Sequence, residues 1–347
     1  MGNIDNINKT MTTVSVVIPC VNEVNTIRHC IESVTSSSGN NIKLEIVVVD
    51  GGSDDGTLEI LSELQKNYNS LKVIQNKRKI TPIGLNKGIT ASSGEFILIL
   101  GAHTTVSRDY IETLVKGLRN DPSAGCAGGV IVSMSDNTLF QQLAGAVGES
   151  RFGVGNSYFR VGVESKVYVD TVAYGLYRRE VLDAVGLFDE RLVRNQDIEL
   201  SHRIRSHGYT IILDPDVSAY YYPRSSLREF IRQSFSNGYW NIITHRLIPG
   251  SLSTRHFVPL AAVVVGIVLF LLSFASVRAR QILTFLMVLY FALDMFESAS
   301  IAYRRQAPRL LLCLFVFPLL HISYGVGSLW SIFSAFNHKS RSIRGAE

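Results

Sequence analysis

Ile46-Val-Val-Val-Asp-Gly-Gly-Ser-Asp-Asp-Gly-Thr57 is the stretch that decides the predicted fold class. Four apolar β-branched residues in a row predict a strand buried on both faces of a sheet. The glycines and small polar residues after Asp50 predict a turn, and a helix-like segment begins near Thr57. Because ligands of open α/β sheets bind beyond the carboxyl ends of the strands, Asp50 is predicted to face a ligand with hydroxyl or N–H donors. A capped helix start, with Ser53 or Asp55 as the cap, is the alternative that needs no ligand.

The alternation of strand-like and helix-like segments continues on both sides of this stretch. It predicts an α/β fold in which a mostly parallel sheet is covered by helices on both faces. Residues 134–170 carry many glycines and few long apolar runs, which indicates a loop-rich insertion over one end of the sheet. After it, we expect a strand at 171–177, a helix at 197–207 and a strand at 210–213. The earlier strands are expected at 14–19, 45–49, 71–75, 96–100 and 127–132, and the helices at 23–34, 58–68, 82–92 and 110–118.

Three apolar segments in the last third of the chain are candidates for membrane spans. A span needs about 20 apolar residues, and residues 257–275 and 310–333 meet this requirement. Residues 282–303 contain Asp294 and Glu297, whose carboxylates are costly in a bilayer unless they face protein or water. This segment is therefore expected to tuck into a helix bundle or to lie partly at the interface. Basic residues flank the segments on both sides, so the positive-inside rule gives no orientation.

A basic amphipathic segment, Leu227–Ile243, precedes the apolar segments. Its apolar side chains recur at near-helical spacing, and Arg224, Arg228 and Arg232 recur every four residues on another face. Such a helix suits a membrane interface, although an ordinary surface helix shows the same pattern. No signal peptide opens the chain, so the α/β domain of a multi-pass cell-membrane protein is expected on the cytosolic side. The expected parts are a polar tail at 1–13, the cytosolic α/β domain at 14–223, an interfacial segment at 224–256, a membrane domain at 257–336 and a basic tail at 337–347.

The composition limits which classes of binding partner and which redox compartment we expect. The formal net charge is +5 and the pI is about 9.0, a balance compatible with nucleic acid or with an anionic membrane surface. The basic residues are spread out and lack the dense run of a nucleic-acid-binding arm, so membrane lipids are the expected partner and nucleic acid is not. The four cysteines form no CxxC or Cys/His spacing, which predicts free thiols in a reducing compartment.

Three further polar residues occupy positions where chemistry is expected. Glu23 follows the first predicted strand, and adjacent parallel strands would bring it close to Asp50. His103 follows the strand at 96–100 and could ligate a divalent metal, although a packed or hydrogen-bonded histidine fits equally. Asp197 lies in the first turn of a helix, where the helix dipole stabilises a carboxylate, and simple capping explains the same placement. No G-x-G-x-x-G follows the first strand, which argues against a dinucleotide site.

Several short motifs follow one another in an order that is specific as a set. In this order and spacing, the chain resembles the family 2 glycosyltransferases of the GT-A fold. Among them it is similar to the membrane-attached enzymes of exopolysaccharide assembly, such as the succinoglycan glucosyltransferases. The resemblance extends from Val14 to Trp240 and more loosely into the apolar segments. The motifs are Val17-Ile-Pro-Cys-Val-Asn-Glu23, Val49-Asp-Gly-Gly-Ser-Asp-Asp-Gly-Thr57, Gly84-Leu-Asn-Lys-Gly88, Ser93-Gly-Glu-Phe96, Gly175-Leu-Tyr-Arg178, Phe188-Asp-Glu190, Asn195-Gln-Asp-Ile-Glu199, Arg232-Gln233 and Gly238-Tyr-Trp240.

The resemblance implies an inverting transfer of a sugar from a UDP-sugar to a saccharide linked to polyprenyl diphosphate. It implies that Pro19, Glu23 and Asp50 hold the uridine part of the donor. Asp197 would be the general base that deprotonates the acceptor hydroxyl. Further nucleotide-sugar contacts would come from Gly52, Ser53, Asn86 and Ala102, and the diphosphate and acceptor would lie near Gly175, Arg178, Gln233 and Trp240.

The chain departs from the family at one important place. Where the family usually has Asp-x-Asp, the sequence reads Gly101-Ala102-His103, and Gln196 replaces a glutamate before the base. The charge of a diphosphate leaving group still has to be neutralised. We therefore expect His103 to bind a divalent cation, with Mn²⁺ favoured over Mg²⁺ because imidazole suits softer ions. The alternative is a non-catalytic membrane subunit that binds a nucleotide-sugar; a transporter is disfavoured because two or three spans make too small a bundle.

Overall fold

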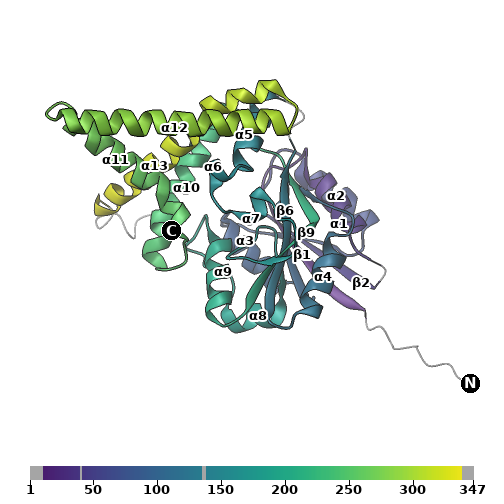
Figure 1. Ribbon diagram of the computed structural model, residues 1–347. Coiled ribbons are helices and arrows are strands. Elements are labelled where there is room, and N and C mark those ends of the chain that lie inside the picture. The colour runs from purple at the N-terminus through teal and green to yellow at the C-terminus, as the bar shows by residue number, and fades with distance from the viewer. Residues whose placement is uncertain (1–10, 40, 135–137, 338–347) are drawn as a thin grey trace, which may run out of the picture. The chain divides into compact units, whose positions relative to one another are not determined.

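The computed structural model describes residues 11–39, 41–134 and 138–337 (Figure 1). Contacts between Cα atoms divide the chain into two units. Unit 1 comprises Met1–Val132 and Gly162–Tyr221, and unit 2 comprises Ser133–Val161 and Tyr222–Glu347. Most of the predicted polar tail at 1–13 and nearly all of the basic tail at 337–347 lie outside the described residues.

Unit 1 is built on a mixed sheet with the strand order β3-β2-β1-β4-β8-β6-β9-β5, and β7 pairs with β9. The first four strands in this order run parallel, whereas β8 is antiparallel to both β4 and β6. The predicted α/β fold class is therefore confirmed, with a parallel half followed by an antiparallel half. The strands are β1 Thr12–Cys20, β2 Ile42–Asp50, β3 Leu71–Gln75, β4 Phe96–Ile99, β5 Thr104–Val106, β6 Ala124–Ser133, β7 Val167–Tyr168, β8 Leu176–Arg178 and β9 Thr210–Tyr221.

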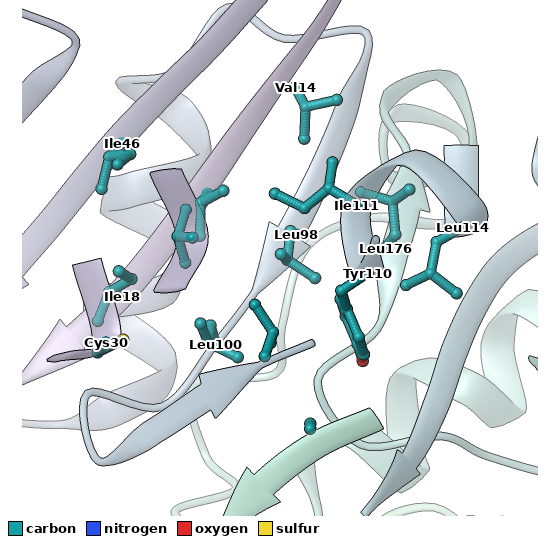
Figure 2. Packing of buried hydrophobic residues seen from close by; sticks show 14 of the residues in the cluster. Val14, Ile18, Cys30, Ile46, Leu98, Leu100, Tyr110, Ile111, Leu114 and Leu176 are labelled. Atoms are coloured by element: carbon teal, nitrogen blue, oxygen red, sulfur yellow. The ribbon is translucent and has the colours of Figure 1, made fainter. Parts of the chain in front are cut away.

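Helices cover both faces of the parallel strands, because alternate residues pack on opposite sides. Val14 and Ile18 belong to the same buried cluster as Cys30 of α1 (Figure 2). On the other face, Gly88 of α3 lets that helix approach closely, since a Cβ there would lie 2.3 Å from Cγ1 of Val17. The helices of unit 1 are α1 Ile27–Ser36, α2 Thr57–Asn67, α3 Thr81–Thr90, α4 Tyr110–Asn120, α8 Arg179–Val185 and α9 Gln196–Ser206.

The prediction of a loop-rich segment at 134–170 is wrong for its central part. This part forms α5 Leu139–Gly148, α6 Arg151–Val154 and α7 Tyr158–Val161, and these helices belong to unit 2. Two of the glycines here, Gly145 and Gly153, serve packing: a Cβ on Gly153 would lie 2.1 Å from the carbonyl oxygen of Val147. Val147 in turn packs in one cluster with Phe317 from the last helix.

The remaining helices of unit 2 include three that are long and apolar enough to cross a membrane, spanning Thr254–Leu272, Val277–Arg304 and Pro308–Ser334. The second helix keeps its carboxylates against protein, as predicted. Asp294 is fully buried and accepts a hydrogen bond from Ser298, while Glu297 accepts one from Ser150 at 2.9 Å. The elements are α10 Leu227–Leu247, η1 Thr254–Phe257, α11 Val258–Leu272, α12 Val277–Arg304, η2 Pro308–Leu312 and α13 Cys313–Asn337.

The basic amphipathic helix α10 packs directly on α13. Small residues bring the two backbones together, as is common in membrane helix pairs. A Cβ on Gly238 would lie 1.9 Å from the carbonyl oxygen of Tyr324, and Ser328 donates a hydrogen bond to the Gly238 carbonyl at 3.0 Å. The segment predicted to lie at the interface therefore contributes a helix to the bundle.

Candidate functional site

The carboxyl ends of β1 and β2 lie side by side, because Cys20 is paired with Asp50 in the parallel register. Asp50 is fully buried, and its carboxylate accepts hydrogen bonds from Gly52 N at 2.8 Å and from the Ser53 hydroxyl at 2.5 Å. Gly52 has a φ of +87°, a conformation that favours glycine. Asp50 thus stands where the sequence predicts it and shapes the turn that follows β2.

The loops after β1 and β2 are joined to each other by side-chain hydrogen bonds. The amide of Asn22 donates to Asp54 and accepts from the Asp54 backbone, each at 2.9 Å. The backbone N–H of Glu23 donates to the hydroxyl of Thr57 at 2.9 Å. Glu23 and the turn after Asp50 therefore share one edge of the sheet, as the parallel arrangement predicts.

His103 reaches the same edge from the loop after β4. Its Nδ1 lies 3.1 Å from Oε1 of Glu23, and the two side chains are 41% and 23% exposed. The other carboxylate oxygen of Glu23 accepts a hydrogen bond from the hydroxyl of Thr26 at 2.7 Å. The ring of Tyr221 meets the imidazole edge-on, with 5.9 Å between centroids. Glu23 was predicted to hold uridine and His103 a cation, and the structure brings these two side chains into contact.

Gly101, next to His103, is closely surrounded by other side chains. A Cβ on Gly101 would lie 3.3 Å from Oγ1 of Thr104 and 3.4 Å from Cε1 of Tyr174. Oγ1 of Thr104 is buried and has no hydrogen-bond partner among the described residues. Ala102 is 2% exposed and packs in the buried cluster of unit 1.

Lys79, which the sequence did not single out, lies beside the turn that follows β2. It follows β3 in a left-handed conformation with φ +56°, and its Nζ lies 3.5 Å from the place that a Cβ on Gly52 would take. The loop is anchored because Asn76 N donates to the Asp50 carbonyl at 2.6 Å. The run Lys77-Arg78-Lys79 directly after a predicted strand was the available signal.

Asp197 lies in the first turn of α9 and is half-buried. Asn195, before the helix, has a φ of +62°, which is uncommon for a residue other than glycine. Burial raises the pKa of the Tyr177 phenol, and the nearby groups Cys126 and Asp197 raise it further. The predicted base thus starts a helix and borders the core of unit 1.

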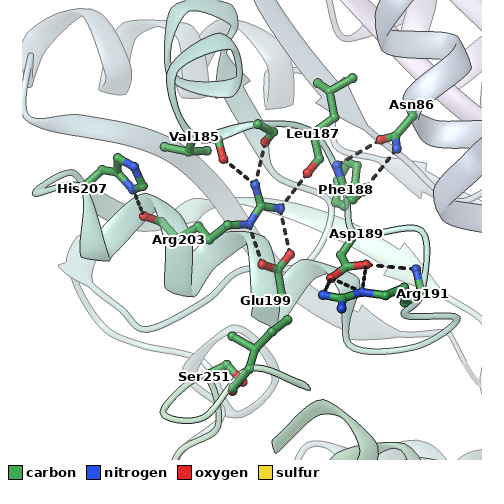
Figure 3. Close-up of polar contacts among 12 residues, drawn as sticks. Asn86, Val185, Leu187, Phe188, Asp189, Arg191, Glu199, Arg203, His207 and Ser251 are labelled. Carbon is green, nitrogen blue, oxygen red and sulfur yellow. Dashed lines mark hydrogen bonds and ion pairs between the residues drawn. The ribbon is translucent and has the colours of Figure 1, made fainter. Parts of the chain in front are cut away.

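Arg203 fixes α9 to the turn before it (Figure 3). Its guanidinium donates to the carbonyl oxygens of Val185 at 2.6 Å and Leu187 at 2.7 Å, and it forms an ion pair with Glu199. On the other side of the turn, Asn86 accepts from Phe188 N and donates to the Phe188 carbonyl, each at 2.9 Å. The amide of Asn86 is therefore engaged in holding the turn, and its contact with the donor stays a prediction.

Arg178 lies far from the carboxyl ends of the parallel strands, where the other candidate residues gather. Arg178 is paired with Phe96, the first residue of β4, whereas His103 follows the last residue of that strand. Its guanidinium donates to the carbonyl of Ala124 at 2.9 Å and lies over the Phe96 ring, 5.8 Å from the centroid. Because β8 is antiparallel to β4, its first residues reach the site and its last residues lead away. The predicted contact of Arg178 with the diphosphate does not fit this placement.

The other predicted residues lie as follows. The carbonyl of Gly175 accepts from Ile99 N at 3.1 Å, next to the end of β4. Pro19 is half-buried near the end of β1, opposite Val49. Gln233 and Trp240 lie on α10 of unit 2 and are half-buried.

The donor atoms needed for a metal are sparse in this region. Within the parts of the chain that the structure describes, no cluster of three or more His, Cys, Asp or Glu side chains could hold an ion. His103 supplies one imidazole at the site edge. All four cysteines are buried free thiols, as predicted.

Comparisons with known proteins agree with this architecture. Residues 15–186 match the family model described as glycosyl transferase family 2. The chain is 32% identical over 259 residues to the succinoglycan biosynthesis protein ExoA of Rhizobium meliloti, covering 73% of this chain and 76% of that protein. It is 28% identical over 278 residues to a Methanococcus voltae transferase, covering 75% of this chain and 84% of that protein. The latter is named dolichyl N-acetyl-α-D-glucosaminyl phosphate 3-β-D-2,3-diacetamido-2,3-dideoxy-β-D-glucuronosyltransferase.

The fold has a solved counterpart. The mannosyltransferase PcManGT of Pyrobaculum calidifontis, solved in complex with GDP-Man and Mn²⁺, superposes with a TM-score of 0.59 at 20% identity. The superposition covers 91% of this chain and 87% of that chain. At this identity the likeness concerns the fold alone.

Proposed function

Because the chain belongs to glycosyl transferase family 2 and is thus a glycosyltransferase, we propose that it transfers a sugar, with inversion, from a UDP-sugar to a polyprenyl-diphosphate-linked saccharide. The name of the Methanococcus voltae relative, which contains a dolichyl-phosphate-linked sugar, supports a lipid-linked acceptor, and the name of ExoA supports a role in exopolysaccharide synthesis. Within its described residues, the chain has three helices that are long and apolar enough to cross a membrane, and such helices would bring the enzyme to a lipid-linked acceptor. The α/β domain then works at the cytosolic face of the cell membrane, where nucleotide-sugars are found.

The placement of Asp197 in the first turn of α9 is the observation that carries this proposal. In a single displacement, the acceptor hydroxyl oxygen bonds to the anomeric carbon as the bond from that carbon to the diphosphate oxygen breaks. Asp197 takes the hydroxyl proton, and UDP leaves with the electron pair. General-base assistance of this kind contributes about 10²–10⁴ in rate. Arg203 and Asn86 support the base by holding the turn before its helix.

The donor nucleoside is proposed to lie over the loops after β1, β2 and β3. The backbone N–H groups of Gly52 and Ser53 donate to the Asp50 carboxylate and so hold the turn in place, and Pro19 lies near the end of the neighbouring strand. Direct contact of Asp50 with uridine stays a prediction, because its carboxylate already accepts bonds from this turn. Lys79 adds a cation next to Gly52, where it can meet the donor diphosphate or ribose.

A divalent cation fits the site through His103. The half-exposed imidazole is a good ligand for Mn²⁺, and its Nδ1 already has a carboxylate neighbour in Glu23. Since the described residues hold no cluster of three ligands, the donor diphosphate and water would complete the coordination. When bound, the cation neutralises charge on the diphosphate.

The test is a UDP-release assay on the full-length protein in detergent, with and without Mn²⁺. A screen of UDP-hexoses and GDP-mannose against prenyl-phosphate- and prenyl-diphosphate-linked saccharides identifies the donor and acceptor. We expect release of UDP that Asp197→Asn abolishes while UDP binding is retained. Release of GDP alone, or turnover unchanged in Asp197→Asn, would contradict the proposal.

The second candidate is a non-catalytic subunit that binds a nucleotide-sugar. The replacement of Asp-x-Asp by Gly101-Ala102-His103 favours it, because a cation site is reduced to one side chain. The same assay separates the two: UDP binding without turnover on any acceptor supports the subunit.

A further inference from the structure

The contact between Glu23 and His103 joins two loops that follow different strands. Nδ1 of His103 lies 3.1 Å from Oε1 of Glu23, across 80 residues of sequence. Both side chains lie at the edge of the sheet where the donor is proposed to bind.

Each partner of this contact is itself held in place. The second oxygen of Glu23 accepts the hydroxyl of Thr26, one residue before α1, at 2.7 Å. The ring of Tyr221, at the end of β9, packs edge-on against the imidazole. Among the described residues, Nε2 of His103 makes no hydrogen bond, and the side chain is 41% exposed. The ring thus turns one nitrogen toward Glu23 and keeps the other open.

We propose that Glu23 is a positioning residue that accepts the Nδ1–H of His103 and so presents the Nε2 lone pair to a divalent cation. The proposal rests on the proposed function and replaces the predicted contact of Glu23 with uridine. Metal-ligating histidines almost always donate their other N–H to a carboxylate, a carbonyl or water, which fixes the tautomer and raises ligand basicity. Because the chain has a single histidine where the family usually has two carboxylates, cation binding depends strongly on the orientation of that imidazole ring.

Two other roles for Glu23 make different predictions. A uridine contact would lower UDP affinity even without metal. Direct ligation of the cation by Glu23 would depend on its charge, so the neutral glutamine would not replace it. A positioning role needs only an acceptor oxygen, which the glutamine amide also supplies.

The experiment measures Mn²⁺ binding to the full-length protein at saturating UDP by electron paramagnetic resonance. Spin-echo modulation reports whether nitrogen-14 coordinates the Mn²⁺. The variants are Glu23→Ala, Glu23→Gln and His103→Ala. Glu32→Ala is the matched control, since Glu32 faces His29 at 3.8 Å on the exposed side of α1. Calorimetry with EDTA gives UDP affinity without metal, and circular dichroism checks that each variant is folded.

We expect nitrogen coupling in the wild-type protein, and its loss in His103→Ala. Glu23→Ala should weaken Mn²⁺ binding about 10–100-fold with UDP affinity in EDTA unchanged, and Glu23→Gln should restore most of it. The positioning role is overturned if Glu23→Ala binds Mn²⁺ as tightly as Glu32→Ala, if Glu23→Gln is as weak as Glu23→Ala, or if UDP affinity in EDTA falls. A wild-type protein that binds UDP but not Mn²⁺ overturns this inference alone. A protein that binds no UDP overturns the proposed function as well.

Discussion

Asn86 and Phe188, 102 residues apart in sequence, are joined by a reciprocal pair of hydrogen bonds, each 2.9 Å long. The pair ties α3 to the turn that leads to α9. Since Asp197 stands in the first turn of α9, the amide of a residue remote from the chemistry helps to set the position of the base.

Replacing Asn86 by alanine should therefore affect both stability and turnover. Loss of its amide leaves the backbone groups of Phe188 unpaired, which costs about 1–3 kcal/mol. A small displacement of Asp197 should lower kcat by roughly tenfold or more, with a smaller change in donor KM. Thr90→Val, on the exposed side of the same helix, is the control. Equal kcat for the two variants would show that the turn keeps its place without Asn86.

The carboxylate of Glu45 links strands at the end of the sheet away from the candidate site. It accepts bonds from Lys72 at 2.6 Å, Ser15 at 2.6 Å and Ser93 N at 2.8 Å. Burial alone raises the pKa of Glu45, but these bonds outweigh it and lower the pKa from 4.5 to about 2. A pKa lowered in the folded state gives stability that is present above the unfolded value and is lost as the pH falls toward 2.

In the Glu45→Gln variant, the free energy of unfolding should therefore fall less steeply as the pH is lowered. Between about pH 5 and pH 2 the wild-type protein should lose about 3 kcal/mol that the variant does not lose. Pulse proteolysis with pepsin in urea measures this across the range. Glu95→Gln, at an exposed carboxylate near Arg119, should follow the wild-type profile. Parallel profiles for wild type and Glu45→Gln would contradict the assignment.

Lys79→Gly separates the charge of this residue from its backbone conformation. Glycine adopts the left-handed φ of +56° without strain, so thermal stability should stay the same or rise. Loss of the ammonium group beside Gly52 should weaken UDP binding by roughly tenfold, as expected for one charge-assisted contact. Calorimetric titration with UDP checks this, and Lys77→Ala controls for net charge. An unchanged UDP affinity would remove Lys79 from the donor site.

Gly238→Ala tests the contact between α10 and α13. The added methyl group would lie 1.9 Å from the Tyr324 carbonyl, so the helices must separate, at a cost of about 1–3 kcal/mol. Thermal unfolding in detergent should shift to lower temperature. Gly266→Ala on α11, where a Cβ meets nothing within 4 Å, should leave the transition where it is or raise it. Equal unfolding temperatures for the two variants would contradict the close packing of α10 on α13 at Gly238.

Local sequence patterns and the general rules of parallel sheets were enough to predict the strands and the edge at which their ends meet. The valines before Asp50 defined a strand, and parallel pairing brought Glu23 to the same edge. The direction of β8 was not predictable in this way. Whether Arg178 lies near or far from the site depends on an antiparallel pairing with β4 that no local pattern encodes.

Contacts between side chains from distant loops also could not be predicted from the sequence. The approach of His103 to Glu23 depends on the adjacent placement of β1 and β4 and on side-chain rotamers. Glycines in residues 134–170 gave a wrong prediction for a related reason. Glycine marks a turn when φ is positive, but Gly145 and Gly153 serve close packing inside helices.

The segment that carries α5, α6 and α7 has a consequence for anyone who wishes to prepare a soluble catalytic fragment. It interrupts unit 1 in the sequence but packs with the carboxyl-terminal helices of unit 2. A chain cut after Tyr221 would keep Leu143, Val147 and Phe152 while discarding their partner Phe317. Such a fragment would present an apolar helix face to water and aggregate. A short polar linker in place of this segment, rather than truncation alone, is the route to an isolated α/β domain.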